Sequence, residues 1–161
     1  MALVLNLDNI LTQITTIASG ITGIRQAFNY DEWPDVPPGL PNENYAYHFT
    51  ALPGEVGGGV RYLLRGSDLH EYEIVVPLYT VVAPAAQIKR ARLWAAPFFG
   101  RYPETYRDRL HLNSAISAGS ALFEQPAVIV RDIPNYDGYE DFYILRHMLT
   151  VHTKGSASVS L

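Results

Sequence analysis

The chain has 161 residues, of which 48% are hydrophobic and 17% are charged, and its mean hydropathy is near zero. These values are typical of one globular domain with a hydrophobic core and exclude an intrinsically disordered chain. The formal net charge of −4, without any run of Lys or Arg, argues against electrostatic capture of nucleic acid, and the absence of cysteine excludes disulfides and cysteine-based zinc sites.

Hydrophobic residues recur at helical spacing near the N-terminus and predict an amphipathic helix that ends at Gly20. The residues with this spacing are Leu7, Ile10, Leu11, Ile14, Ile17, Ala18 and Ile21. We expect Asn6 or Asp8 to cap the helix and a short strand to follow over 21–30. Polar residues interrupt the apolar run and no basic residues precede it, so we expect neither a signal peptide nor a membrane span.

Residues 32–44 form a proline-rich arm that carries Trp33. Its prolines are incompatible with a strand ladder and predict an extended, polyproline-II-like segment. In one interpretation Trp33 packs against the domain's own core. In the other, the arm contacts a neighbouring subunit, and Trp33→Ala would then impair assembly more than folding. The candidate inter-subunit residues of the second interpretation are Trp33, Pro37, Pro38, Tyr45 and Tyr47.

Strands are predicted over 44–52, 60–65 and 69–82, and an antiparallel meander is the simplest way to connect them. Alternation in the long strand 69–82 gives one drier face, which we expect on the core: His70, Tyr72, Ile74, Val76, Leu78, Thr80 and Val82. The other face starts acidic, with Glu71 and Glu73, and becomes apolar, as if only part of it were covered. Pro77 cannot donate a hydrogen bond, so we expect this strand to lie at a sheet edge or to be interrupted there.

A helix is predicted over 85–96, with Pro84 near its first turn. We expect Pro97 to interrupt it and Pro103 to begin a second segment that extends to about Leu110. A buried strand is predicted over 128–130, and the last strand, 140–153, is apolar on both faces, so it should lie mid-sheet or be covered twice.

These elements predict one domain over residues 1–161 with an α+β fold. The expected architecture is a mixed, mostly antiparallel sheet on which an N-terminal helix and a central helical segment pack. Besides the arm at 32–44, the domain should have a flexible C-terminal tail from Lys154, because that segment is small and polar.

Catalytic chemistry has one weak candidate in this sequence. Glu71 and Glu73 share a strand face, and paired carboxylates can perform acid–base catalysis, but no motif links them to a nucleophile or to a second pair. The five histidines show no recognised ligand spacing with a carboxylate, and the glycine run 57–59 lacks the lysine of a phosphate-binding loop. Six basic residues could line a path for DNA, but such residues more often rim helices and pair with acids. They are Lys89, Arg90, Arg92, Arg101, Arg107 and Arg109. We therefore expect no catalytic residue, no cofactor and no metal site.

The order of features along residues 5–154 is more informative than any motif. An apolar helix is followed by a short strand ending in Phe28-Asn29-Tyr30-Asp31, a proline-rich excursion and strands. Then come an Ala- and Arg-rich run at 88–96, the break at Pro97-Phe98-Phe99, and a closing strand ending in Met148-Leu149-Thr150-Val151-His152. This layout resembles that of the tail terminator (tail completion) proteins of long-tailed bacteriophages.

The resemblance implies a structural role without enzymatic activity or cofactor. Subunits of that family form a six-fold ring that caps the tail tube, stops its polymerisation and presents a docking face to the head-side connector. The implied partners are other copies of the chain in a hexameric ring, the tail tube protein, and a head-side connector or stopper protein. The implied location is the head-proximal end of the virion tail, after assembly in the host cytoplasm and without a membrane. The alternatives are another head–tail connector or minor tail protein, or a small enzyme that uses Glu71 or Glu73.

In such a ring, DNA would pass through the lumen without specific binding. Six copies of a chain with charge −4 carry −24 in total, and an acidic lumen would disfavour contact with phosphates. Glu71 and Glu73 are our candidate lumen residues, and Asp137, Glu140 and Asp141 are the rival set.

Overall fold

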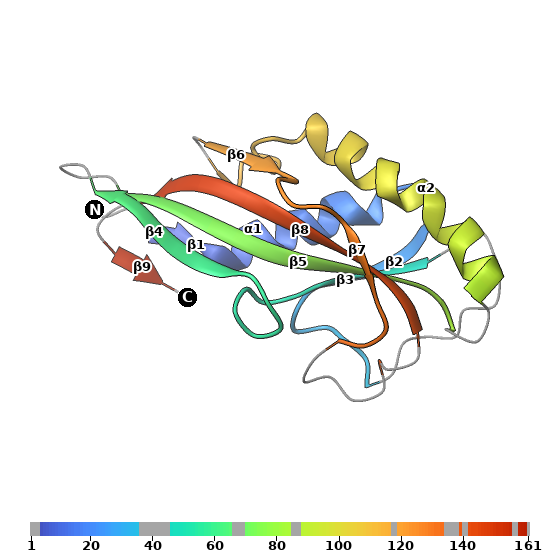
Figure 1. The fold of residues 1–161 in the computed structure, drawn as a ribbon. Coiled ribbons are helices and arrows are strands. Elements are labelled where there is room, and N and C mark those ends of the chain that lie inside the picture. The colour runs from blue at the N-terminus through green and yellow to red at the C-terminus, as the bar shows by residue number, and fades with distance from the viewer. Residues whose placement is uncertain are drawn as a thin grey trace.

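The computed structural model describes residues 4–35, 46–65, 70–84, 88–116, 119–133, 139, 142–155 and 158–160. Over these residues the chain has the predicted α+β fold, a mostly antiparallel mixed sheet with two helices packed on it (Figure 1). The helices are α1 (Leu7–Ser19) and α2 (Ile88–Arg107). The strands are β1 (Val4–Asn6), β2 (Ile24–Phe28), β3 (Ala46–Thr50), β4 (Gly59–Arg65), β5 (His70–Pro84), β6 (Gly119–Leu122), β7 (Val128–Val130), β8 (Phe142–Gly155) and β9 (Ser158–Ser160).

The centre of the sheet is the long antiparallel pair β5–β8, whose register runs from His70 opposite Gly155 to Pro84 opposite Phe142. Along the free side of β5, β4 pairs with its first half and β3 with its second half. Along the free side of β8, β7 pairs with its first half and β6 with its second half. Strand β2 pairs in parallel with β3, which makes the sheet mixed, and β1 and β9 form a separate parallel pair.

Two predictions about β5 are settled by this pairing. The strand does not lie at a sheet edge; instead its ladder is interrupted at Pro77 on one side, which was the second alternative. The β4 ladder ends at Val75, the β3 ladder begins at Leu78, and the missing N–H of Pro77 falls between them. The predicted meander is confirmed for β4 and β5, which pair antiparallel, and is wrong for β3, which among the described residues pairs with β5 and not with β4.

The alternation in β5 is confirmed, and each face of the strand belongs to a different hydrophobic core. Tyr72, Ile74 and the following alternate residues face a core that contains the buried sides of α1 and α2. On the opposite face, Glu71 and Glu73 are half-buried, whereas Tyr79 and Val81 lie in a second, aromatic core with Phe28 and Phe49. Strand β8 is likewise buried on both faces, as the sequence predicts for a mid-sheet strand.

Helix α1 agrees with the sequence prediction at both ends. Asn6 caps it, and its side-chain oxygen accepts a 3.0 Å hydrogen bond from the backbone N–H of Asn9. Gly20 follows the last helical residue and closes the helix with hydrogen bonds to the carbonyls of Ile17 and Ala18.

Helix α2 is one continuous helix, so the predicted break at Pro97 and second start at Pro103 are wrong. Both prolines are exposed, and the carbonyls that lose a helical donor belong to Leu93 and Phe99, two exposed residues that water can reach. The buried residues recur every three or four positions across both prolines: Ala91, Ala95, Phe98, Tyr102 and Tyr106. Burial of this stripe outweighs two missing hydrogen bonds on the solvent side.

Trp33 packs against the protein's own core, which is the first of the two interpretations. Its indole N–H donates a 3.0 Å hydrogen bond to the carbonyl of Thr50, and its ring contacts those of Phe49, Tyr79 and Tyr139 at 5.3–6.3 Å between centroids. Tyr47 is also buried in this core, and the chain does not present it on the surface. The other candidate inter-subunit residues, Pro37, Pro38 and Tyr45, lie outside the described residues.

Three smaller differences concern the end of the sheet and the tail. Strand β7 has the predicted bounds but is not buried, since Ile129 is exposed. Strand β8 continues two residues past the expected end, through Lys154 and Gly155, and β9 forms part of the expected tail.

Neither helix is long and apolar enough over its described residues to cross a membrane.

We predict that Trp33→Ala destabilises the fold by about 3 kcal/mol, because it removes a large aromatic side chain from the second core together with its hydrogen bond. Urea denaturation of the purified chain measures this loss. Leu93→Ala is the control, since Leu93 is 75% exposed and its truncation should change stability by less than about 0.5 kcal/mol. Equal stability of Trp33→Ala and wild type would contradict the packing described here.

Candidate functional site

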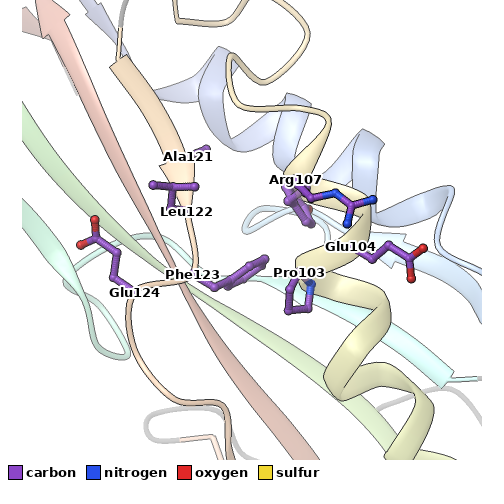
Figure 2. Close-up of a pocket in the computed structure, with 8 residues that line it drawn as sticks. Pro103, Glu104, Arg107, Ala121, Leu122, Phe123 and Glu124 are labelled. Atoms are coloured by element: carbon purple, nitrogen blue, oxygen red, sulfur yellow. The ribbon is translucent and has the colours of Figure 1, made fainter.

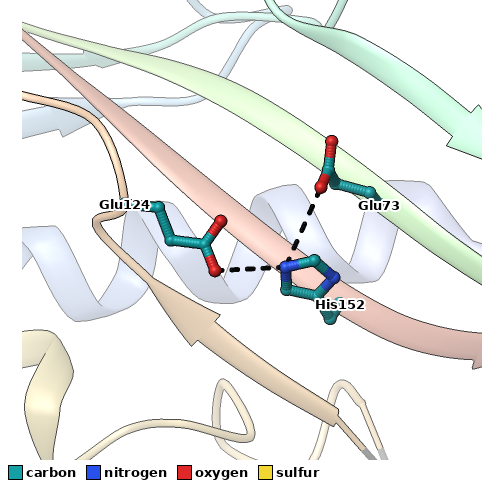
Figure 3. Close-up of side chains that lie close together, drawn as sticks. All are labelled: Glu73, Glu124 and His152. Atoms are coloured by element: carbon teal, nitrogen blue, oxygen red, sulfur yellow. Dashed lines mark hydrogen bonds and ion pairs between the residues drawn. The ribbon is translucent and has the colours of Figure 1, made fainter.

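Three potential ligand groups converge on the face of the sheet opposite the helices: Glu73, Glu124 and His152 (Figure 3). Nε2 of His152 lies 3.2 Å from Oε1 of Glu124 and 3.9 Å from Oε2 of Glu73. One ligand atom from each residue lies within 4.8 Å of the other two. The group is partly sheltered, and the Glu73 side chain is only 17% exposed.

The sheet register places two of these residues together. Glu73 on β5 and His152 on β8 are directly opposite each other in the ladder, so their side chains leave the same face. Glu124 follows β6, which pairs with the other side of β8. Phe123 points toward α2 and packs against Tyr106, with 5.4 Å between ring centroids, so the next residue is directed to the opposite face (Figure 2).

Basic side chains neutralise part of this face. Arg61, on β4 opposite Glu73, pairs with its carboxylate at 3.0 Å. Nζ of Lys154 lies 3.7 Å from Oε1 of Glu71. Both candidate lumen residues therefore have a cationic neighbour. The rival set, Asp137, Glu140 and Asp141, lies outside the residues whose side chains the structure describes.

Two cavities flank the three converging side chains. One, of about 530 Å³, lies between α2 and the segment 121–124 and has a mostly apolar lining that includes Tyr106, Leu122 and Phe123 (Figure 2). The other, of about 400 Å³, is lined by Glu73 together with Arg61, Gly58 and Gln125. The second cavity therefore gives Glu73 a route to solvent.

A chain of buried polar groups crosses the helix-side core. The Thr80 hydroxyl donates to the Tyr102 oxygen at 2.7 Å, and that oxygen lies 2.7 Å from Nδ1 of His48. Nε2 of His48 lies 2.7 Å from the Thr50 hydroxyl, which is 2.8 Å from that of Thr15. A neutral His48, with one ring nitrogen accepting and the other donating, satisfies both of its neighbours. Burial, together with the nearby His147, lowers the pKa of His48 to about 3.

His147 lies next to this chain without joining it. Its ring stacks on Tyr102 at 4.5 Å between centroids, and Phe99 and Phe123 pack around it. Among the described residues neither buried ring nitrogen has a hydrogen-bond partner, and burial lowers the pKa of His147 to about 4. The imidazole thus packs in the core as a neutral aromatic ring, and its two unsatisfied nitrogens lower the stability of the fold.

Two of the basic residues considered for a DNA path have partners within the protein. Arg101 donates a 2.8 Å hydrogen bond to the carbonyl of Thr22 and lies over the ring of Phe98. Arg107 pairs with its neighbour Asp108 at 3.7 Å. Arg101 therefore fastens α2 to the segment after α1. Arg107 pairs with an acid, as the sequence favoured for these residues.

The structure joins only one of the two predicted carboxylates to other chemically useful groups. Glu73 belongs to the three converging side chains, whereas Glu71 pairs with Lys154. Sequence reasoning missed His152 and Glu124, because they lie 79 and 51 residues from Glu73. The sequence predicts the strands 69–82 and 140–153, but no local pattern defines whether they pair or in which register.

Comparison with models of known protein families and with curated protein sequences finds no match for this chain.

We predict that the protein loses stability as the pH falls below about 6.5, the pKa of histidine in an unfolded chain. The unfolded state then takes up protons that the folded state cannot accept until the pH approaches about 4 at His147 and about 3 at His48. His147→Phe should abolish the His147 share of this loss, about 3 kcal/mol between pH 6.5 and 4, and should preserve or raise stability at pH 7.

Urea denaturation at several pH values measures this profile. Ile144→Val serves as the non-titrating core control, which should lower stability by about 1 kcal/mol at every pH. An identical pH profile in His147→Phe and wild type would show that His147 is protonated as easily in the folded state as in the unfolded one.

Proposed function

We propose that this chain is a structural protein of a bacteriophage tail. In this proposal its copies form a ring that caps the tail tube, ends tube polymerisation and provides the interface to the head-side connector. The proposal rests on the resemblance in layout, which the α+β fold fits, and on one structural observation. Apolar side chains are exposed on both lateral borders of the sheet, where a neighbouring copy could cover them.

One border is β4, which pairs only with β5 among the described residues. Its Val60, Tyr62 and Leu63 side chains are 37–47% exposed. On the other border, Leu122 of β6 and Ile129 of β7 are 42% and 45% exposed. Strands with exposed apolar side chains and unpaired edges are common sites of association between chains.

The two borders are different surfaces, and this favours a ring. A contact that joins one border to the other is heterologous: it repeats from copy to copy and closes if the rotation per copy divides a full turn. A contact between two identical borders would instead give a two-fold dimer. The register of β4 shifts between Tyr62 and Leu64, a bulge that disfavours direct strand addition, so side-chain packing should dominate the contact.

The enzyme alternative has less support from the geometry. Glu71 and Glu73, the pair on which it depended, have cationic neighbours in Lys154 and Arg61. Another ring-forming connector or minor tail protein would use the same borders. Binding to the end of a tail tube, rather than to a head-side ring, distinguishes the terminator from these relatives.

We predict that the purified chain forms an annulus visible in negative stain and a matching oligomer in size-exclusion chromatography with light scattering. Leu63→Glu and Leu122→Glu, one on each border, should each weaken assembly at least tenfold (about 1.4 kcal/mol), because a carboxylate would be buried at the contact without a partner.

The control is Leu93→Glu, which alters a more exposed leucine on α2, away from both borders. It should assemble as wild type does, and all three variants should remain folded by circular dichroism. A wild-type chain that stays monomeric at the highest attainable concentration, or border variants that assemble normally, would contradict the proposal.

A further inference from the structure

We infer that Glu73, Glu124 and His152 form a binding site for a divalent transition-metal ion of the zinc type. This inference concerns a site that the proposed ring function does not require, and it does not depend on that function.

The first argument is geometric. Around a zinc ion bound at 2.0–2.2 Å, tetrahedral ligand atoms lie about 3.4 Å from one another. Nε2 of His152 is 3.2 Å from Oε1 of Glu124 and 3.9 Å from Oε2 of Glu73. Small rotations of the two glutamate side chains would bring all three atoms to the required separation. Nε2 is the imidazole nitrogen that faces both carboxylates (Figure 3), so no ring flip is needed.

The second argument is the rigidity of the support. Glu73 and His152 are cross-strand neighbours on β5 and β8, the two most extensively paired strands. Glu124 is the residue after Phe123, whose ring is held by Tyr102, Tyr106 and His147. A metal site needs ligands that are held in place before the ion arrives, and this site has two on central strands and one next to an aromatic anchor.

The third argument concerns which ion the site fits. One imidazole and two carboxylates suit zinc, which accepts nitrogen and oxygen ligands in a four-coordinate site. Calcium and magnesium favour six or more oxygen ligands and fit poorly. The ion would neutralise Glu124 and share Glu73 with Arg61, which lies 3.0 Å from that carboxylate and can hold it in position.

With three protein ligands, a fourth position is left for water. The cavity of about 400 Å³ that Glu73 lines leaves space on that side of the site. Without metal, Nε2 of His152 lies within hydrogen-bond distance of Oε1 of Glu124, at 3.2 Å. A bound ion would take the place of this contact.

The test uses the full-length chain, stripped of metal with a chelator, and zinc ions alone as the probe. Isothermal titration calorimetry should give one saturable site per chain. Thermal denaturation should give a higher melting temperature with zinc than without it. His152→Ala and Glu124→Gln should each weaken binding at least about tenfold, while circular dichroism shows that the fold is kept.

Two matched controls separate this site from adventitious binding. His111→Ala removes an exposed histidine beyond α2, and Glu71→Gln removes a carboxylate from the same face of β5. Both variants should bind zinc as wild type does. The inference is overturned if wild type shows no saturable binding, if His152→Ala binds as tightly as wild type, or if His111→Ala loses the site.

Discussion

The ladder between β5 and β8 determines where every other layer of the molecule must lie. Both strands are apolar on both faces over most of their length, so neither face of the ladder can be left to water. The two helices cover one face. Trp33 and the aromatic residues around it cover part of the other, and where this cover ends the face becomes polar. The candidate site, with Glu73 and His152 on neighbouring strands, lies in that polar part.

The parts of the fold that depend on local pattern were predictable from the sequence. Alternation in β5 placed Tyr72 and Glu73 on opposite faces, and helical spacing with a cap at Asn6 or Asp8 located α1, because each signal is a short-range property of the chain. The pairing of β3 and β4 with the two halves of β5 was not predictable, because a strand pattern does not name its partner. The break expected at Pro97 failed because local preference was overridden by the buried stripe of α2.

The candidate site was also predictable from the sequence only in part. Glu73 could be selected as a strand residue on a polar face, but its partners come from segments that only the sheet register brings close.

The metal inference and the ring proposal rest on different residues. The first rests on three side chains of one chain, and the second on the apolar borders of the sheet. Loss of either would leave the other intact.

The two prolines of α2 have a consequence for the order in which the molecule can form. A peptide with this sequence would lack two backbone donors and would contain several aromatic residues, so its intrinsic tendency to be helical is low. The segment depends for its helical shape on the burial of Phe98, Tyr102 and Tyr106 against the rest of the protein. We therefore expect the sheet and α1 to form first and α2 to pack onto them late in folding.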